Sequence, residues 1–189
     1  MSIVKNNDPQ IRQRRSIRLP GYDYSQPGAY FITLVTHNRA CLFGNVEGEE
    51  VQLYVAGHIV REEWLRTGDI RPSVELDAFV IMPNHIHGII VLGCDTLGGS
   101  MPGEGTLQRA PTVERFGKPT SNTIPTIVRL FKSVTTKRIN ELRDAPGVPV
   151  WQRNYHEHVI RDESEWECIR VYIQSNPYNW AEDSENPGI

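Results

Sequence analysis

Cysteine is scarce in this chain, and several other features that would define a protein class are missing. The three cysteines, Cys41, Cys94 and Cys168, are widely spaced and form no C-x-x-C pair. Neither a disulfide framework nor a cysteine zinc site is therefore indicated, and a reducing cytoplasm fits. The longest apolar runs are only strand-length, and the N-terminus lacks the apolar core of a secretory signal. We therefore expect a cytoplasmic protein that does not engage a membrane.

A strong net charge is also absent. The formal charge is −3, and 39% of the 189 residues are hydrophobic. This composition suits a single soluble domain and identifies no partner. The local distribution is uneven, because residues 181–189 form an acidic tail whereas residues 1–28 form a basic arm that contains Arg12, Arg14, Arg15 and Arg18. Such an arm can bind an anionic polymer, although a disordered, solvated terminus would have the same composition.

Hydrophobic periodicity and turn residues predict the element order β-α-β-β-α-β-α. We expect strands at 30–36, 73–82, 85–92 and 154–160, and helices at 55–68, 123–142 and 162–176. The short Pro83-Asn84 turn should pair the second and third strands as a hairpin. The first six elements match the ferredoxin-like split β-α-β pattern. The expected fold class is therefore α+β, with a four-stranded antiparallel ferredoxin-like (RRM-like) sheet, its helices and an added C-terminal helix.

The periodic pattern is lost between the third strand and the second of these helices. Residues 93–122 are rich in Gly, Pro and Thr. A loop of this length is usually functional or disordered. We interpret it as a mobile insertion within one domain that covers residues 29–180, and not as a domain boundary.

The helix at 123–142 has two distinct sides. Ile127, Phe131, Val134 and Leu142 can lie toward the core. The other side is basic and rich in hydroxyl groups, and it includes Arg129, Lys132, Ser133, Thr136, Lys137 and Asn140. Such a side can bind phosphate groups, although a solvated helix face would have the same composition.

The third strand lies in the sequence VIMPNHIHGIIVL, where His85 and His87 interrupt an apolar run. Residues i and i+2 share one face of a strand, so the two imidazoles should be neighbours and could hold one metal ion. The alternative is a pair of histidines that are hydrogen-bonded separately, because burying an imidazole without a partner is costly. Three metal families with this spacing are disfavoured, since the further ligands of metallo-hydrolases, histidine-triad hydrolases and two-histidine phosphoesterases are missing.

The last helix could complete such a site. Tyr172 and Asn176 are four residues apart, so they lie one turn apart on the same side of a helix. A tyrosine nucleophile and an amide-oxygen ligand would complete a site with two histidines and one oxygen ligand. By spacing alone, Tyr172 could equally be a core aromatic, and Asn176 could simply end the helix before Pro177.

Five segments resemble one known family. They are RRSIRLPGYDYSQPGAYFIT, PNHIHGIIVL, FKSVTTKRIN, VWQRNYHEHVIRDE and YIQSNP, and they occur in the expected order. Together they resemble the REP-associated tyrosine transposases, a branch of the single-tyrosine HUH transposases. The resemblance extends from Arg14 to Trp180.

The resemblance implies a metal-dependent transposase that nicks and rejoins hairpin-associated single-stranded DNA in DNA transposition. Tyr172 matches the catalytic nucleophile, which forms a 5′-phosphotyrosine. His85, His87 and Asn176 match the ligands of a divalent metal, Mg²⁺ or Mn²⁺. The matching DNA contacts are Arg14, Arg15 and Arg18 in the arm, for bases beside the hairpin, and Lys132, Ser133, Thr136, Lys137 and Arg138 in the helix, for the DNA backbone.

The same resemblance implies the partners and the setting. The expected partner is single-stranded or hairpin DNA similar to REP palindromes, and the expected location is the bacterial cytoplasm beside the nucleoid. Single-tyrosine transposases are often homodimers that exchange their tyrosine helices, whereas the REP-associated branch resembles a monomer that acts in cis.

Two other functions fit parts of the sequence. An RRM-like sheet could bind hairpins or single strands without cutting them, although the third strand carries histidines where stacking aromatics would be expected. A metal-dependent phosphodiesterase with a water nucleophile is the other possibility. A second H-x-H sequence, His156 and His158 around Glu157, is a weaker candidate for a metal or phosphate contact. Tyr155 beside it is the rival nucleophile.

Overall fold

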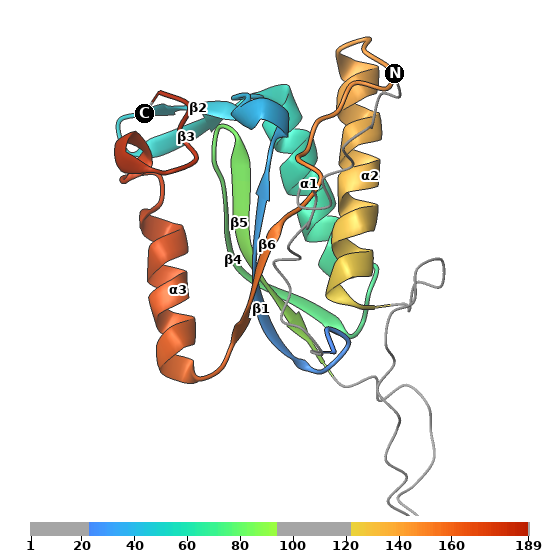
Figure 1. The fold of residues 1–189 in the computed structure, drawn as a ribbon, viewed down its shortest axis with the longest axis vertical. Helices are drawn as coiled ribbons and strands as arrows, with labels where there is room; N and C mark the ends of the chain where they lie inside the picture. Colours follow the sequence, from blue (N-terminus) through green and yellow to red (C-terminus); the bar gives the residue numbers. More distant parts are fainter. Residues whose placement is uncertain (1–22, 94–121, 189) are drawn as a thin grey trace, which may run out of the picture.

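The computed structural model describes residues 23–93 and 122–188, and its centre is a four-stranded antiparallel sheet (Figure 1). The strand order is β4-β5-β1-β6. The strands are β1 (Gly28–Val35), β4 (Val74–Ile81), β5 (His85–Leu92) and β6 (His156–Ile160), and the helices are α1 (Val55–Asp69), α2 (Ile124–Leu142) and α3 (Glu163–Ser175). The predicted α+β class is therefore confirmed, and the predicted strands and helices occur in the expected order with one additional hairpin.

Several predictions fall on residues outside this description. The basic arm lies in residues 1–22 for the most part, and the insertion at 93–122 is described only at its two ends. Arg14, Arg15 and Arg18 are therefore not described, and the proposed division of the chain stays a prediction. Within residues 23–93 and 122–188, no helix combines the length and apolar character needed to cross a membrane.

The two faces of the sheet carry different layers. Helices α1 and α2 pack on one face over a large core that includes Trp64, Phe131 and Trp151. Helix α3 covers part of the other face over a smaller core of Ala29, Ile89, Ile160 and Ile173. Because alternate residues of a strand point to opposite faces, His85 and His87 lie on the α3 side of β5.

Close packing on the α1 side depends on Gly88. A Cβ at this position would overlap the indole ring of Trp64. Trp64 is only 1% exposed, so its ring cannot move into solvent to make room. The glycine that follows His87 therefore lets α1 approach the strand that carries the candidate metal ligands.

A polar cluster fixes α3 to the edge strand β4. The pairing of β4 with β5 is irregular between Leu76 and Phe79, and Asp77 lies in this irregular stretch. Its carboxylate accepts hydrogen bonds from Trp166 Nε1 and from Arg170 Nε, the latter at 2.8 Å. This cluster holds α3 at a defined position over the sheet.

Some local predictions were incomplete or wrong. The hairpin of β2 (Gly44–Glu47) and β3 (Glu50–Leu53) was not predicted, because four-residue strands are too short to show a clear alternation. Leu142 was expected in the core, but it is the last residue of α2 and is 53% exposed. Asn140 was expected on the solvent side, but it is buried and donates a hydrogen bond to the Val148 carbonyl at 2.9 Å.

Candidate metal and nucleophile site

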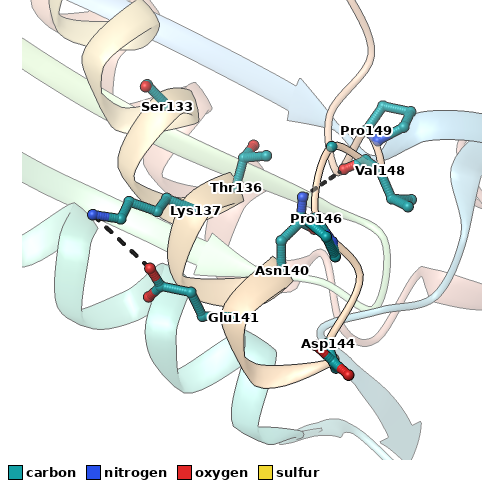
Figure 2. Close-up of a pocket in the computed structure, with 10 residues that line it drawn as sticks. Ser133, Thr136, Lys137, Asn140, Glu141, Asp144, Pro146, Val148 and Pro149 are labelled. Atoms are coloured by element: carbon teal, nitrogen blue, oxygen red, sulfur yellow. Dashed lines mark hydrogen bonds and ion pairs between the residues drawn. The ribbon is translucent and has the colours of Figure 1, made fainter.

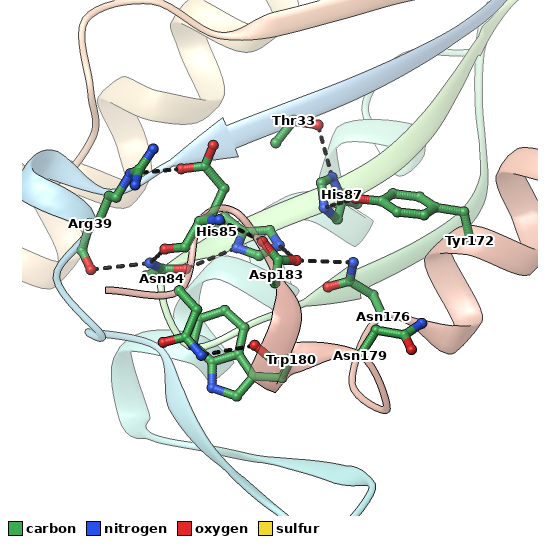
Figure 3. Close-up of polar contacts among 12 residues, drawn as sticks. Thr33, Arg39, Asn84, His85, His87, Tyr172, Asn176, Asn179, Trp180 and Asp183 are labelled. Atoms are coloured by element: carbon green, nitrogen blue, oxygen red, sulfur yellow. Dashed lines mark hydrogen bonds and ion pairs between the residues drawn. The ribbon is translucent and has the colours of Figure 1, made fainter. Parts of the chain in front are cut away.

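The two histidines of β5 lie side by side in a mostly buried polar site (Figure 3). The ring centroids of His85 and His87 are 4.5 Å apart. Their side chains are almost fully buried, with relative exposures of 0% and 4%. The prediction that they share one face is confirmed, and Tyr172 and Asn176 of the α3 segment approach the same place.

The imidazole of His87 lies between a strand and a helix. Its Nδ1 is 2.8 Å from the hydroxyl oxygen of Thr33, the residue directly opposite on β1. Its Nε2 is 3.2 Å from the phenol oxygen of Tyr172. When Nδ1 donates its proton to Thr33, the lone pair of Nε2 faces the tyrosine, which can then donate to it.

The orientation of His85 is fixed by the residue before it. The side-chain amide of Asn84 donates to the carbonyls of Arg39 at 3.1 Å and Glu185 at 2.6 Å, so its Oδ1 must face the histidine. His85 Nδ1 lies 2.9 Å from this oxygen and therefore carries the proton. The lone pair of His85 Nε2 consequently points into the site, the orientation that a metal ligand requires.

A third ligand group comes from a residue that the sequence analysis missed. Asp183 lies 3.9 Å from His85 Nε2 through its Oδ2, and its side chain is 7% exposed. Ligand atoms of His85, His87 and Asp183 all lie within 4.8 Å of one another. Asp183 belongs to the segment predicted only as an acidic tail. The sequence held no usable signal, because isolated acids near a chain end are common and usually solvated.

Asn176 lies beside this group at the end of α3. It is 2% exposed, and its Nδ2 is 3.4 Å from Asp183 Oδ2. Within the described part of the chain, neither Asn176 Oδ1 nor His85 Nε2 finds a hydrogen-bond partner. Buried polar atoms without partners are costly, and a divalent cation would satisfy both atoms at once. The residues present therefore fit a metal ion.

The electrostatics of the site favour neutral imidazoles. Burial lowers the pKa of His85 to about 4, although the Asp183 carboxylate and Asn176 act in the opposite direction. Burial lowers the pKa of His87 to about 2, and the neighbouring His85 adds to this effect. Both rings are thus uncharged at neutral pH, as metal ligation requires.

The tyrosine is held in its protonated form. Burial raises the pKa of Tyr172, and the Asp183 carboxylate raises it further, whereas a hydrogen bond with Asn176 lowers it. Its side chain is nevertheless 46% exposed, so a large substrate can reach it. A reaction at this oxygen therefore needs a group that takes up the phenol proton.

The rival residues occupy other positions. Tyr155 packs against the large core on the α1 and α2 side, with Lys132 Nζ 5.6 Å from its ring centroid. His158 Nε2 is 2.7 Å from a carboxylate oxygen of Glu165. Glu157 points to the face opposite the two histidines of its strand, as predicted, and it is buried there.

The predicted DNA contacts of α2 fall into two groups. Ser133, Thr136 and Lys137 line a cavity of about 530 Å³ against the chain at 144–149 (Figure 2). Lys137 also pairs with Glu141 at 3.9 Å, and the other two cations have closer partners within the protein. Lys132 Nζ donates to the carbonyls of Gln152 and Asn154, both at 2.9 Å, and Arg138 pairs with Glu62 and Glu63 at 2.7 and 2.8 Å.

Comparisons with known proteins place this chain among relatives. An uncharacterised protein of Haemophilus influenzae is 42% identical over 177 residues, which cover 92% of this chain and 93% of that protein. The two belong to one family. No protein-family model matches the chain.

One solved structure identifies the architecture. A REP-associated tyrosine transposase bound to a REP hairpin matches with a TM-score of 0.53 and 21% identity, covering 82% of this chain and 70% of that one. This chain has the REP-associated tyrosine transposase fold. A crystal structure of a transposase candidate from Deinococcus radiodurans also matches. That match covers 83% of this chain and 96% of the other chain, with 18% identity and a TM-score of 0.40.

Proposed function

We propose that this chain is a transposase-like enzyme that nicks and rejoins single-stranded DNA through a covalent bond to Tyr172. The observation that carries the proposal is the 3.2 Å approach of the Tyr172 phenol oxygen to His87 Nε2, beside buried groups that fit a metal ion. A nucleophile and metal-ligating groups at this separation suit phosphoryl transfer. The transposase fold agrees with this chemistry without proving it.

The groups that would hold the metal are His85 Nε2, His87 Nε2 in place of its hydrogen bond with Tyr172, and a carboxylate oxygen of Asp183, with Asn176 Oδ1 as the further ligand. Asp183 is our addition to the set that the sequence suggests. We expect Mg²⁺ or Mn²⁺, since oxygen ligands suit both ions and either ion would have room for a phosphate oxygen among its ligands. When bound, the ion would polarise the scissile phosphate and offset the charge that develops on it.

Tyr172 is the nucleophile in this mechanism. Its oxygen attacks the phosphorus in line and gives up its proton to water, which reaches the partly exposed side chain, and a bond forms between phosphorus and the phenol oxygen. The bond to the 3′ oxygen breaks, and that oxygen leaves as a 3′-hydroxyl after it takes up a proton. The 5′-phosphotyrosine keeps the energy of the phosphodiester, so another 3′-hydroxyl can reverse the step without ATP.

The protein positions this nucleophile through α3. Asp77 holds Trp166 and Arg170 of the helix against β4, and this places Tyr172 over His87 of the same chain. One chain therefore brings together the nucleophile and all of the proposed ligands. We propose that the enzyme acts in cis and does not need to exchange helices with a second copy.

The proposed substrate is hairpin DNA with single-stranded flanks, because the transposase that shares the fold is bound to a REP hairpin. The cavity lined by Ser133, Thr136 and Lys137 is the proposed contact for the DNA backbone. The arginines of the arm, Arg14, Arg15 and Arg18, are the proposed contacts beside the hairpin. Such a substrate would place the protein at the bacterial nucleoid.

The test is covalent adduct formation on a denaturing gel with labelled hairpin DNA and Mn²⁺. Tyr172→Phe should lose the adduct but keep DNA and metal binding, because phenylalanine keeps the ring contacts with Phe31 and His87 and lacks only the hydroxyl. Tyr155→Phe is the matched control and should form the adduct normally. Binding without any adduct in the wild type, across metals and substrates, would favour a non-catalytic nucleic-acid-binding module.

A further inference from the structure

An exposed histidine lies on the site's face of the sheet. His156 is the first residue of the edge strand β6, and it pairs with Thr33, which in turn pairs with His87. The three side chains therefore form a row across the sheet on the α3 side. His85 and His87 are buried, whereas His156 is exposed. Helix α3 and strand β6 diverge from their connection (Figure 1).

Phe31 links this exposed histidine to the proposed nucleophile. Its ring stacks on His87 at a centroid distance of 5.4 Å and an interplanar angle of 25°. It also makes edge contacts with His156 at 6.3 Å and with Tyr172 at 6.0 Å. Phe31 is only partly buried, so an aromatic surface extends from Tyr172 to the edge of the sheet.

No polar group of the described residues holds the ring of His156. Its neighbour on the same strand and face, His158, is instead engaged by Glu165 at 2.7 Å. Partial burial lowers the pKa of His156, and His158 adds to this effect, which favours the uncharged form of the ring. A neutral, exposed ring on an RRM-like sheet is suited to stacking on a base and poorly suited to neutralising a phosphate.

We propose that His156, backed by Phe31, is a stacking site for a nucleobase of single-stranded DNA next to the phosphate that Tyr172 attacks. This deepens the proposed function and rests on it. The aromatic surface would orient the strand so that its phosphate reaches the phenol oxygen. The histidines of β5 leave no stacking aromatic on that strand, but the other central strand, β1, carries Phe31.

The test measures affinity in the full-length protein, without metal so that no chemistry occurs. The probe is a labelled hairpin oligonucleotide selected on the wild-type protein from a pool with randomised stems and flanks. His156→Ala should weaken binding roughly 5- to 150-fold, the range for loss of one base stack. His156→Phe should keep the affinity, and His156→Asn should lose it, because only the first retains a ring. His158→Ala is the control and should change affinity little.

A second set of probes locates the base. Each carries one abasic position in a single-stranded flank. For one position beside the cleavage site, base removal should weaken wild-type binding and leave His156→Ala binding unchanged. If His156→Asn keeps the DNA affinity and His156→Phe loses it, His156 makes a polar contact, and the stacking proposal is overturned. If base removal weakens the binding of wild type and His156→Ala equally at every position, stacking on His156 is also overturned, and the proposed function stands. Failure to select any DNA would overturn both.

Discussion

The phenol oxygen of Tyr172 lies 3.2 Å from Nε2 of His87, although 85 residues separate them in the chain. Strand β5 and helix α3 carry these two groups, and the helix is held by contacts on the far side of the sheet from α1 and α2. The residues that fix each group are as important as the groups themselves. Most of the predictions below concern those supporting residues.

Asn84 should control the metal affinity of His85 without contacting the metal. Asn84→Ala removes the oxygen that holds the proton on His85 Nδ1, so the imidazole loses its fixed tautomer and orientation. We expect Mn²⁺ affinity, measured by calorimetry, to fall about 10- to 100-fold. Asn179→Ala is the matched control, because its exposed side chain donates to the Ser175 carbonyl and does not face His85. Equal affinities in the two variants would contradict this role.

Asp183 should behave as a metal ligand. Asp183→Asn keeps the size of the side chain but removes its charge, and we expect a loss of Mn²⁺ affinity of about tenfold or more, at least the loss expected for a supporting residue. Glu182→Gln, one residue earlier in the same turn and exposed, should leave the affinity unchanged. If Asp183→Asn binds Mn²⁺ with wild-type affinity, Asp183 is not a ligand, and the metal site consists of His85, His87 and Asn176 alone.

Much of this site could be predicted from local periodicity. Alternation along a strand places His85 and His87 together, and helical spacing does the same for Tyr172 and Asn176. Asp183 could not be predicted in this way. It reaches the site because the chain turns back over the sheet after α3, and this turn is held by backbone groups, including the Glu185 carbonyl that accepts from Asn84. Such contacts depend on the backbone path and leave no residue pattern.

The binding partners of the α2 cations could not be predicted from the sequence either. Arg138 directly follows Lys137 in the helix, but the sequence does not say which helix packs beside them. In the structure α1 supplies Glu62 and Glu63, and Arg138 pairs with both. Lys132 is likewise held by two carbonyls from the segment before β6. Partners 20 or more residues away decide these roles.

Asp77 should stabilise the docking of α3. Asp77→Ala leaves Trp166 and Arg170 without their shared acceptor, and we expect the free energy of unfolding to fall by about 1–3 kcal/mol, because hydrogen bonds to charged groups are among the stronger ones. Urea denaturation measures the change. Glu167→Gln should alter stability by less than about 0.5 kcal/mol, since its ion pair with Arg170 is exposed. A loss of adduct formation should accompany only the first variant.

Gly88→Ala should destabilise the sheet beneath the site. The added methyl group would overlap the buried Trp64 ring, and overpacking of this kind costs about 1–3 kcal/mol. Gly93→Ala is the control, because a methyl group there would make only an ordinary contact with the Ser73 carbonyl at 3.6 Å. Thermal unfolding of the two variants compares them, and equal melting temperatures would show that α1 can shift away from β5.

The most direct test of the central claim is to find which tyrosine becomes linked to DNA. Wild-type protein is incubated with hairpin DNA and Mn²⁺, digested with nuclease and trypsin, and analysed by fragmentation mass spectrometry. Cleavage after Arg170 releases residues 171–189, whereas cleavage after Arg153 and Arg161 releases residues 154–161 with Tyr155. We predict a nucleotide-linked 171–189 peptide whose fragments place the phosphate on Tyr172. A link on Tyr178 of that peptide, or on Tyr155, would contradict the account.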